Sequence, residues 1–367
     1  MLAGARAMLT RRDPVHAVNA MRGWLDRRHA FLIDSCTSAI YVALVAFQTE
    51  TNRNEVIVPA YTADSVVHAV RKASLVPVFC DVSLDDFNMD PDLARRAVTE
   101  KTLAIVGVHA FGLPSAALAD LKRDFPEVFL IEDCAQAMGS RLGGGYAGNA
   151  GDVSVFSFNR GKNLPAYGGG LMTTNSGALR EKIEWVFGNL NPARGPFEGL
   201  RSLVRIAALA AVTRPRVYGV LGPLLGRYRE RPTPEDFDVH RCTAAQAGAA
   251  ASLLERLEED SETRYRNGTA LIDGLKGLDG LKPPAVAGNT RPAFSRLPVL
   301  FEDTGRRDRA AEALRDAGIE TSRMYPEPLA DLPHARYAAE HLLTLPTHPL
   351  LNESDVTTIM ETVKACT

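Results

Sequence analysis

One lysine stands apart from the other seven lysines of this 367-residue chain. Lys162 follows the apolar stretch VSVFSF and lies in a turn rich in glycine, asparagine and proline, NRGKNLPAYGGG. The other seven lie on charged helix faces, near strand starts or near the end of the chain, where a solvated amine is expected. A lysine just past a buried strand can point into a cleft, where partial desolvation lowers its pKa and makes the amine nucleophilic. Lys162 is therefore the candidate nucleophile.

A carboxylate, Asp133, ends the apolar stretch VFLIED. Open α/β sheets bind ligands at the carboxyl ends of their strands. A carboxylate there could pair with the protonated ring nitrogen of pyridoxal phosphate, which keeps the ring an electron sink. The local sequence equally allows Asp133 to be only the N-cap of a helix, CAQAMG. Gln136 would then lie one helical turn on, on the same side, where it could donate to the ring hydroxyl.

Hydroxyl side chains stand before the first long helix, in Ser35-Cys36-Thr37-Ser38. Hydroxyls and free N–H groups at a helix N-terminus form a ready phosphate site, although serine and threonine cap helices of every kind. Ser157 adds a hydroxyl on the strand before Lys162 and is otherwise an ordinary strand serine. The candidate groups for an amine, a ring nitrogen and a phosphate thus come from three separate stretches.

The elements that must position these residues alternate between short apolar strands and helices. Asp90 is the expected N-cap of a helix that begins at Pro91. Near-continuous apolar strands that alternate with helices predict a parallel sheet covered on both faces. The expected strands are 55–62, 76–82, 103–112, 128–137, 152–159 and 168–175.

The pattern predicts two domains. Residues 1–240 form the large domain, with an insertion at about 188–236 that is rich in glycine, proline and arginine. A helical stretch at 243–275 leads out of it. Residues 241–367 comprise this linking stretch and a smaller α+β C-terminal domain.

Composition excludes several function classes. The 42 basic and 44 acidic side chains give a net charge of −2, so no basic excess points to nucleic acid. Five cysteines without a CxxC pair indicate neither a zinc ribbon nor a redox motif, and no metal site is expected. A sparse, odd count fits a reducing compartment, and the first residues lack a signal peptide pattern. We therefore expect a cytoplasmic protein.

The most apolar region, 206–225, is interrupted by Arg214-Pro215-Arg216 and falls short of the ~20 residues that a membrane-spanning helix needs. We expect a buried helix pair here. A peripheral membrane contact through residues 203–225 is the alternative.

Several stretches, in the right order, resemble the DegT/DnrJ/EryC1/StrS family of pyridoxal-phosphate-dependent sugar aminotransferases. They are SCTSAIYVAL, NEVIVPAYT, PVFCDVSLDDFNMDP, VGVHAFGLP, IEDCAQAMGS, GDVSVFSFNRGKNL, GGGLMTTN and LPTHPLLNESDV. The resemblance runs from about residue 30 to the end, apart from the insertion. It implies a fold-type-I aminotransferase with a mostly parallel seven-stranded sheet in the large domain. It also implies a homodimer with the active site at the subunit interface.

The resemblance also implies roles for single residues. Lys162 matches the Schiff-base lysine, and Asp133 matches the partner of the pyridine nitrogen. Related sugar dehydratases carry histidine in place of the lysine, so Lys162 favours transamination. The other cofactor contacts that the resemblance implies are Gln136, Thr37 and Ser38 at the phosphate, Ser157, and Tyr61 in place of a stacking aromatic.

Four positions depart from the family pattern. Cys36 replaces a glycine, Ala63 replaces the stacking aromatic, and Gly168 replaces the glutamate of an EGG motif. Val239, two residues before Arg241, replaces the asparagine that reaches the partner subunit's phosphate. We expect this last change to weaken the cross-subunit grip on the phosphate.

The expected reaction moves an amino group from an amino acid, glutamate in the family, to a keto-sugar attached to a nucleotide, with ping-pong kinetics. Arg323 and Tyr325 match a stretch that contacts substrate, although a surface salt bridge would equally explain Arg323. His109, at a strand end, is expected to be a satisfied core histidine rather than a catalytic one. The alternatives are a sugar dehydratase, a cyclitol aminotransferase and a degenerate, non-catalytic binding subunit.

Overall fold

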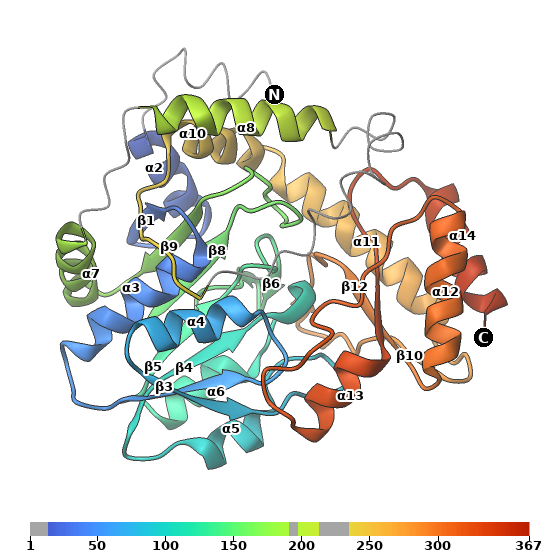
Figure 1. Cartoon of the computed structure of the whole chain (residues 1–367), viewed down its shortest axis with the longest axis horizontal. Helices are drawn as coiled ribbons and strands as arrows, with labels where there is room; N and C mark the ends of the chain where they lie inside the picture. Colours follow the sequence, from blue (N-terminus) through green and yellow to red (C-terminus); the bar gives the residue numbers. More distant parts are fainter. Residues whose placement is uncertain (1–13, 191–196, 213–234, 367) are drawn as a thin grey trace.

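A seven-stranded sheet forms the centre of the large domain in the computed structural model, which describes residues 14–190, 197–212 and 235–366 (Figure 1). The strands follow the order β1-β9-β8-β5-β4-β2-β3. All run parallel except β9, which is antiparallel to both of its neighbours. The mostly parallel seven-stranded sheet is therefore confirmed. Its strands are β1 (His29–Ile33), β2 (Glu55–Pro59), β3 (Val76–Cys80), β4 (Thr102–Val108), β5 (Phe129–Asp133), β8 (Val153–Ser157) and β9 (Gly170–Thr174).

The central strands are buried on both faces, which is why they appear in the sequence as continuous apolar runs. Every residue of β4, β8 and β9 is buried. One face packs under α3 (Cys36–Gln48), α4 (Asp64–Lys72) and α7 (Gly177–Asn189). The opposite face is covered by α5 (Pro91–Ala97), α6 (Ala117–Asp124), α2 (Pro14–Trp24) and α10 (Ala244–Leu254).

The predicted helix start at Asp90 is confirmed. The Asp90 carboxylate accepts hydrogen bonds from the N–H groups of Asp92 and Leu93 at 2.9 Å each, and Pro91 begins the helix. Ser35 caps α3 in the same way, because its hydroxyl accepts the Ser38 N–H at 3.0 Å.

The predicted strands generally run past the observed strand ends, and the two largest overruns are at 103–112 and 128–137. The strand predicted at 103–112 ends at Val108, and residues Ala110–Gly112 form a 3₁₀ turn with Phe111 at φ 55°. The stretch predicted at 128–137 ends at Asp133 and continues as a turn, not as a helix. In both places the chain turns out of the sheet, and the two turns contact each other through a hydrogen bond from the Phe111 N–H to the Gln136 side chain.

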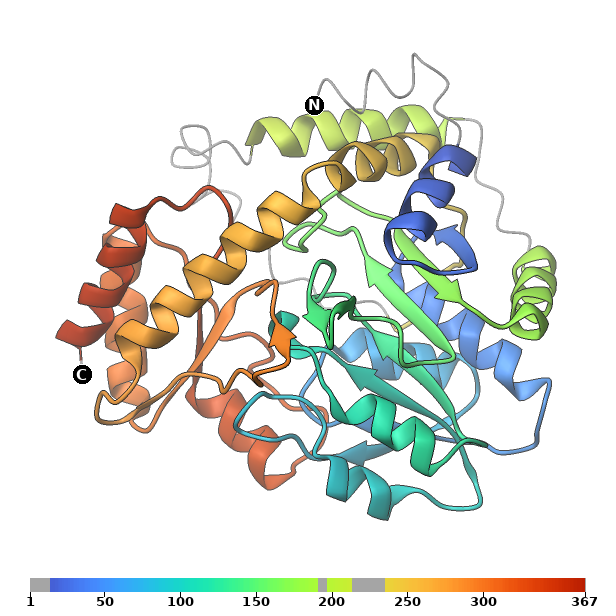
Figure 2. The same ribbon diagram turned by 180° about the vertical axis from the view of Figure 1, so that it is seen from behind.

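The helical stretch at 243–275 consists of two helices, α10 and α11 (Leu257–Leu275), separated at Glu255 and Arg256. α10 packs beside α2, while α11 runs obliquely from there to the C-terminal layer (Figure 2). The boundary at residue 240 stays a prediction, as does the insertion at 188–236, part of which lies outside the described residues.

The C-terminal layer joins short strands to three helices, α12 (Thr304–Asp316), α13 (Pro333–His341) and α14 (Glu353–Ala365). Its antiparallel sheet has the order β10-β12-β13, and a separate small sheet has the order β11-β6-β7. A side chain from the large domain holds this layer: Asp81 accepts the N–H groups of His334 and Ala335 at 2.9 and 2.8 Å, at the start of α13. The short strands are β10 (Leu281–Lys282), β12 (Leu297–Phe301), β13 (Leu342–Leu345), β11 (Thr290–Arg291), β6 (Arg141–Leu142) and β7 (Gly145–Tyr146).

One further helix, α8 (Glu198–Val212), lies against α10 at the edge of the large domain (Figure 1). It contains residues 203–212 of the stretch considered for membrane contact, whereas residues 213–225 lie outside the described part of the chain. Among the described helices, none combines the length and the apolar character that crossing a bilayer requires.

Candidate active site

A cavity of about 620 Å³ lies at the carboxyl ends of the parallel strands. The cavity is lined by the last residues of β4, β5 and β8, which are Val108, Asp133 and Ser157. This edge is where open α/β sheets place their ligands. The volume falls in the range of about 300–1,000 Å³ that is typical of small-molecule sites.

The cavity brings Lys162 and Asp133 together, although 28 residues separate them in the sequence. Burial lowers the pKa of the Lys162 amine, against the opposing influence of Asp133 and Cys36. A lowered pKa increases the share of neutral amine, which is the nucleophilic and basic form. The geometry therefore supplies an activated amine and a carboxylate in one pocket.

Asp133 is a buried carboxylate with few donors. Its Oδ1 accepts the Ala135 N–H at 2.8 Å and the Cys36 thiol at 3.7 Å, and no described residue donates to Oδ2. Burial raises the pKa of Asp133 above its ordinary value. A cationic partner in the cavity would stabilise the ionised form, so this carboxylate suits a protonated ring nitrogen.

The start of α3 forms another wall of the cavity. Ser35, Cys36 and Thr37 line it, and the first N–H groups of a helix have no acceptor within the helix. Ser38 is fully buried and outside the lining, because its N–H and hydroxyl both bond to the Ser35 hydroxyl. The structure thus brings Thr37 to the cavity but turns Ser38 away from it. Ser157 lines the cavity as well.

Gln136 and Tyr325 form a fixed pair on the cavity wall. The Gln136 amide nitrogen donates to the Tyr325 hydroxyl at 2.6 Å. Its oxygen accepts the Phe111 N–H at 3.0 Å and the Ser295 hydroxyl at 3.1 Å. These bonds leave the Gln136 amide with little freedom to rotate, so its donor groups are held in a single orientation.

Tyr61 and Arg323 do not line the cavity. The Tyr61 hydroxyl donates to the Met324 carbonyl at 2.7 Å, and the ring packs edge-on against Tyr325, with 5.5 Å between ring centroids. Tyr61 therefore supports Tyr325 from behind, and Ala63 occupies the cavity wall. Arg323 is exposed to solvent outside the lining residues.

The backbone explains one departure from the family pattern. Gly168 has φ 132°, in the region that side chains rarely adopt, and a Cβ there would lie 2.4 Å from Nε2 of Gln246. A glutamate at this position would be strained and would displace Gln246. Val239 is buried among the core residues on the α3 face of the sheet, so it takes no part in the cavity.

Sequence reasoning missed four polar residues of α8 that line the cavity. They are Glu198, Arg201, Ser202 and Arg205. Their spacing of three, four and seven residues along a helix was a usable signal, since it places all four on one face. The stretch was assigned only to an insertion, and its face toward the cavity depends on how α8 packs.

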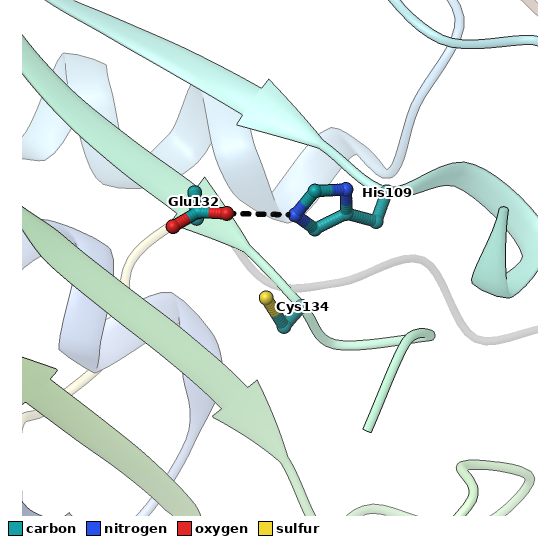
Figure 3. A group of neighbouring side chains, drawn as sticks. All are labelled: His109, Glu132 and Cys134. Carbon is teal, nitrogen blue, oxygen red and sulfur yellow. Dashed lines mark hydrogen bonds and ion pairs between the residues drawn. The ribbon is translucent and has the colours of Figure 1, made fainter. Parts of the chain in front are cut away.

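A second titratable cluster, His109, Glu132 and Cys134, lies next to the site but is closed to ligands (Figure 3). Nδ1 of His109 accepts the Ser115 N–H at 2.9 Å, so the proton lies on Nε2 and points to Glu132 at 3.1 Å. Both ring nitrogens are therefore engaged and offer no lone pair to a metal. The prediction that His109 is a satisfied core histidine is confirmed.

The family comparison decides the identity of this site. The DegT/DnrJ/EryC1/StrS aminotransferase family matches residues 18–198 and 239–364, which include all the cavity residues outside α8 and Glu198 itself. The chain belongs to this family. It is an aminotransferase, and the family's cofactor is pyridoxal 5′-phosphate.

Curated relatives and solved structures agree with this assignment. The chain is 28% identical over 358 residues to a dTDP-3-amino-3,4,6-trideoxy-alpha-D-glucose transaminase of Streptomyces venezuelae, covering 93% of this chain and 83% of that protein. It is 30% identical over 298 residues to a dTDP-4-dehydro-2,6-dideoxy-D-glucose 3-dehydratase of Saccharopolyspora spinosa, covering 77% and 61%. The crystal structure of S. venezuelae DesV superposes with a TM-score of 0.79 at 26% identity, covering 99% and 93%.

The residues of this chain fit pyridoxal phosphate. Lys162 would hold the aldehyde end, and Asp133, with its open Oδ2, would face the ring nitrogen. The start of α3 with Thr37, together with the Ser157 hydroxyl, would hold the phosphate. When bound, the cofactor supplies an electron sink for the substrate carbon.

Proposed function

We propose that this protein transfers an amino group from glutamate to a keto-sugar linked to a nucleotide, in the biosynthesis of an amino sugar for a polysaccharide or a secondary metabolite. The observation that carries the proposal is that Lys162 and Asp133 line the same cavity, whose volume is typical of small-molecule sites. The printed activities of relatives, such as the S. venezuelae transaminase, support a nucleotide-linked sugar as the acceptor.

Each of the cavity residues has a separate role in the proposed reaction. Lys162 would move a proton between the substrate carbon and the aldehyde carbon of the cofactor, and its lowered pKa favours the neutral amine that accepts this proton. Asp133 keeps the proton on the ring nitrogen by charge pairing. Gln136 and Tyr325 hold one edge of the cavity in place. We assign no substrate role to Arg323, because its side chain lies outside the cavity.

We further propose that the protein acts as a cytoplasmic homodimer with its active sites at the subunit interface. Family membership supports this arrangement. Sedimentation of the cofactor-loaded protein tests it, and a monomer with full activity would refute it.

The test of the proposed function combines covalent trapping with two half-reactions. Borohydride reduction of the cofactor-loaded protein, followed by peptide mapping, should label Lys162. Glutamate alone should convert the visible absorbance of the cofactor to that of its amine form, and a panel of dTDP- and UDP-linked keto-sugars should reverse the change. Lys162→Ala should lose all three signals, while Lys276→Ala, at an exposed lysine, should keep them. A labelled peptide elsewhere, or no response to any amino donor, would overturn the proposal.

Sugar dehydration is the second candidate, because one relative has that activity in its name. Lys162 argues against it, because a lysine amine can carry the proton between the two carbons that transamination requires, whereas related sugar dehydratases have histidine at this position. Product analysis separates the two: an amino sugar supports transamination, whereas a deoxygenated keto-sugar without nitrogen supports dehydration.

A further inference from the structure

The guanidinium groups of the cavity come from α8. Of the described residues that line the cavity, the arginines are Arg201 and Arg205. Lys162 supplies an amine at the strand ends, whereas the arginines lie on a helix at the edge of the domain. The cavity therefore has a second positive region, separate from the reactive amine.

α8 is held in place by a face that does not include its arginines. Ile206 is buried, and Leu203 packs against the same core cluster as the alanines of α10. Leu200 and Val204 form the outer, exposed face of the helix. Since the core contacts are apolar, the position of α8 does not depend on the charges of Arg201 and Arg205.

Both arginines are available to a ligand. Arg201 pairs with Glu198 at 3.0 Å, but 77% of its side chain is exposed, and such a surface pair contributes little and rearranges easily. Arg205 is exposed and has no ion pair with any residue that the structure describes. The α8 residues that line the cavity include one carboxylate, Glu198, and two guanidinium groups, so this wall has a net positive charge.

The spacing of the two arginines favours an extended anion. Positions four apart lie one above the other, separated by a rise of about 6 Å along the helix. One guanidinium satisfies one carboxylate in bidentate fashion. Glutamate has two carboxylates, so the half-reaction with glutamate is needed to separate the donor from the acceptor. A diphosphate carries several oxygens along its length and can engage both groups.

We propose that Arg201 and Arg205 bind the diphosphate of the sugar-nucleotide acceptor and so select acceptors that carry one. The inference rests on the proposed function, and it assigns to α8 a role for which the family gives no template, because the family match leaves residues 199–238 out. The cofactor phosphate has its own site at the start of α3, so the two anions occupy different walls.

The test uses the cofactor-loaded protein and three probes: inorganic pyrophosphate, UDP and dTDP, titrated by calorimetry. The double variant Arg201→Gln with Arg205→Gln should weaken diphosphate binding at least about tenfold, because hydrogen bonds to charged groups are lost. The variants Arg201→Lys and Arg205→Lys should show smaller losses, since they keep the charge but not the bidentate geometry. Val204→Gln, on the outer face of the same helix, is the matched control and should bind as the wild type does.

The half-reaction with glutamate separates this inference from the proposed function. In the double variant its rate should equal that of the wild type. A wild type that fails with glutamate but binds pyrophosphate through the arginines would refute the proposed function and not the anion site. Three results would overturn the inference: a wild type that binds none of the probes, a double variant with unchanged diphosphate affinity, or a loss confined to the glutamate step or to cofactor binding.

Discussion

Two neighbouring carboxylates, Glu132 and Asp133, have opposite environments. They are consecutive residues of β5, and consecutive side chains of a strand point to opposite faces of the sheet. Glu132 accepts hydrogen bonds from His109, from the backbone of Gly148, Ala150 and Gly151, and weakly from Ser154. Asp133 receives one N–H and one thiol and faces the cavity.

The two pKa values move in opposite directions for this reason. Burial alone would raise both, but the bonds from His109 and the backbone N–H groups lower the pKa of Glu132 below its ordinary value. Burial prevails at Asp133 and raises its pKa. A buried charge that the protein satisfies by itself stabilises the fold, whereas one that is left with open acceptor capacity is available to a ligand.

The largest expected effect follows from Asp133→Asn. A neutral amide cannot keep the ring nitrogen charged, so kcat/KM should fall about 10²- to 10³-fold, the scale of removing one preorganised electrostatic group. The folded structure should persist. Steady-state kinetics with circular dichroism checks this, and an active Asp133→Asn enzyme would break the contrast between the two carboxylates.

Glu132→Gln should lower the stability of the fold and leave the activity of the folded protein nearly unchanged. The amide NH₂ would meet donors where the carboxylate now accepts, and leaving a buried donor unsatisfied costs about 1–3 kcal/mol. Urea denaturation of the cofactor-free protein should show this loss in the free energy of unfolding. Activity per folded molecule should stay close to that of the wild type, and a stable but inactive Glu132→Gln protein would contradict the structural role.

A third carboxylate sharpens the comparison. Asp81 is buried and accepts the N–H groups of Val82, His334 and Ala335. Like Glu132 and unlike Asp133, it receives its hydrogen bonds from the protein itself. Asp81→Ala removes the cap of α13 and should cost about 1–2 kcal/mol of unfolding free energy. Asp85→Ala, at an exposed neighbouring carboxylate, is the control and should cost less. Equal losses in the two variants would count against the capping role.

The smallest effects concern pH. Because the pKa of folded Glu132 lies below its ordinary value of 4.5, its stabilisation is complete above 4.5 and is lost as pH falls through the folded pKa. The raised pKa of Asp133 has the opposite sign: ionisation opposes folding at neutral pH, and this penalty disappears as pH falls below the ordinary value of 3.8.

Thermal unfolding of the cofactor-free protein should show this difference between the variants. Near pH 7, Asp133→Asn should have a higher Tm than the wild type and Glu132→Gln a lower one, and both differences should shrink toward acid pH. Bound pyridoxal phosphate should remove the advantage of Asp133→Asn, since the wild-type carboxylate then has a cationic partner. A Tm of Asp133→Asn below that of the wild type without cofactor would contradict the prediction.

Much of the sheet was predictable because its strands are buried on both faces and therefore appear as apolar runs. The strand end at Val108 was not, since the turn that follows depends on a bond between Phe111 and Gln136, which lie 25 residues apart. A left-handed backbone at a phenylalanine has no local signal, because only the tertiary contact stabilises it.

The site was predictable where chemistry is tied to strand ends, as at Lys162 and Asp133. Tyr61 was expected in the cavity, but its hydroxyl reaches Met324, 263 residues away, and this contact fixes the ring behind Tyr325. Arg201 and Arg205 were missed because the packing of α8 on α10 decides which face of the helix meets the cavity. These three placements depend on long-range packing that local patterns do not encode.

The position of α8 has an evolutionary consequence. Lys162 and Asp133 belong to stretches that the family shares, whereas nearly all of α8 falls in the unmatched stretch 199–238. Under the proposed role of Arg201 and Arg205, exchange of that single stretch would change recognition of the acceptor's diphosphate and leave the reaction itself unchanged.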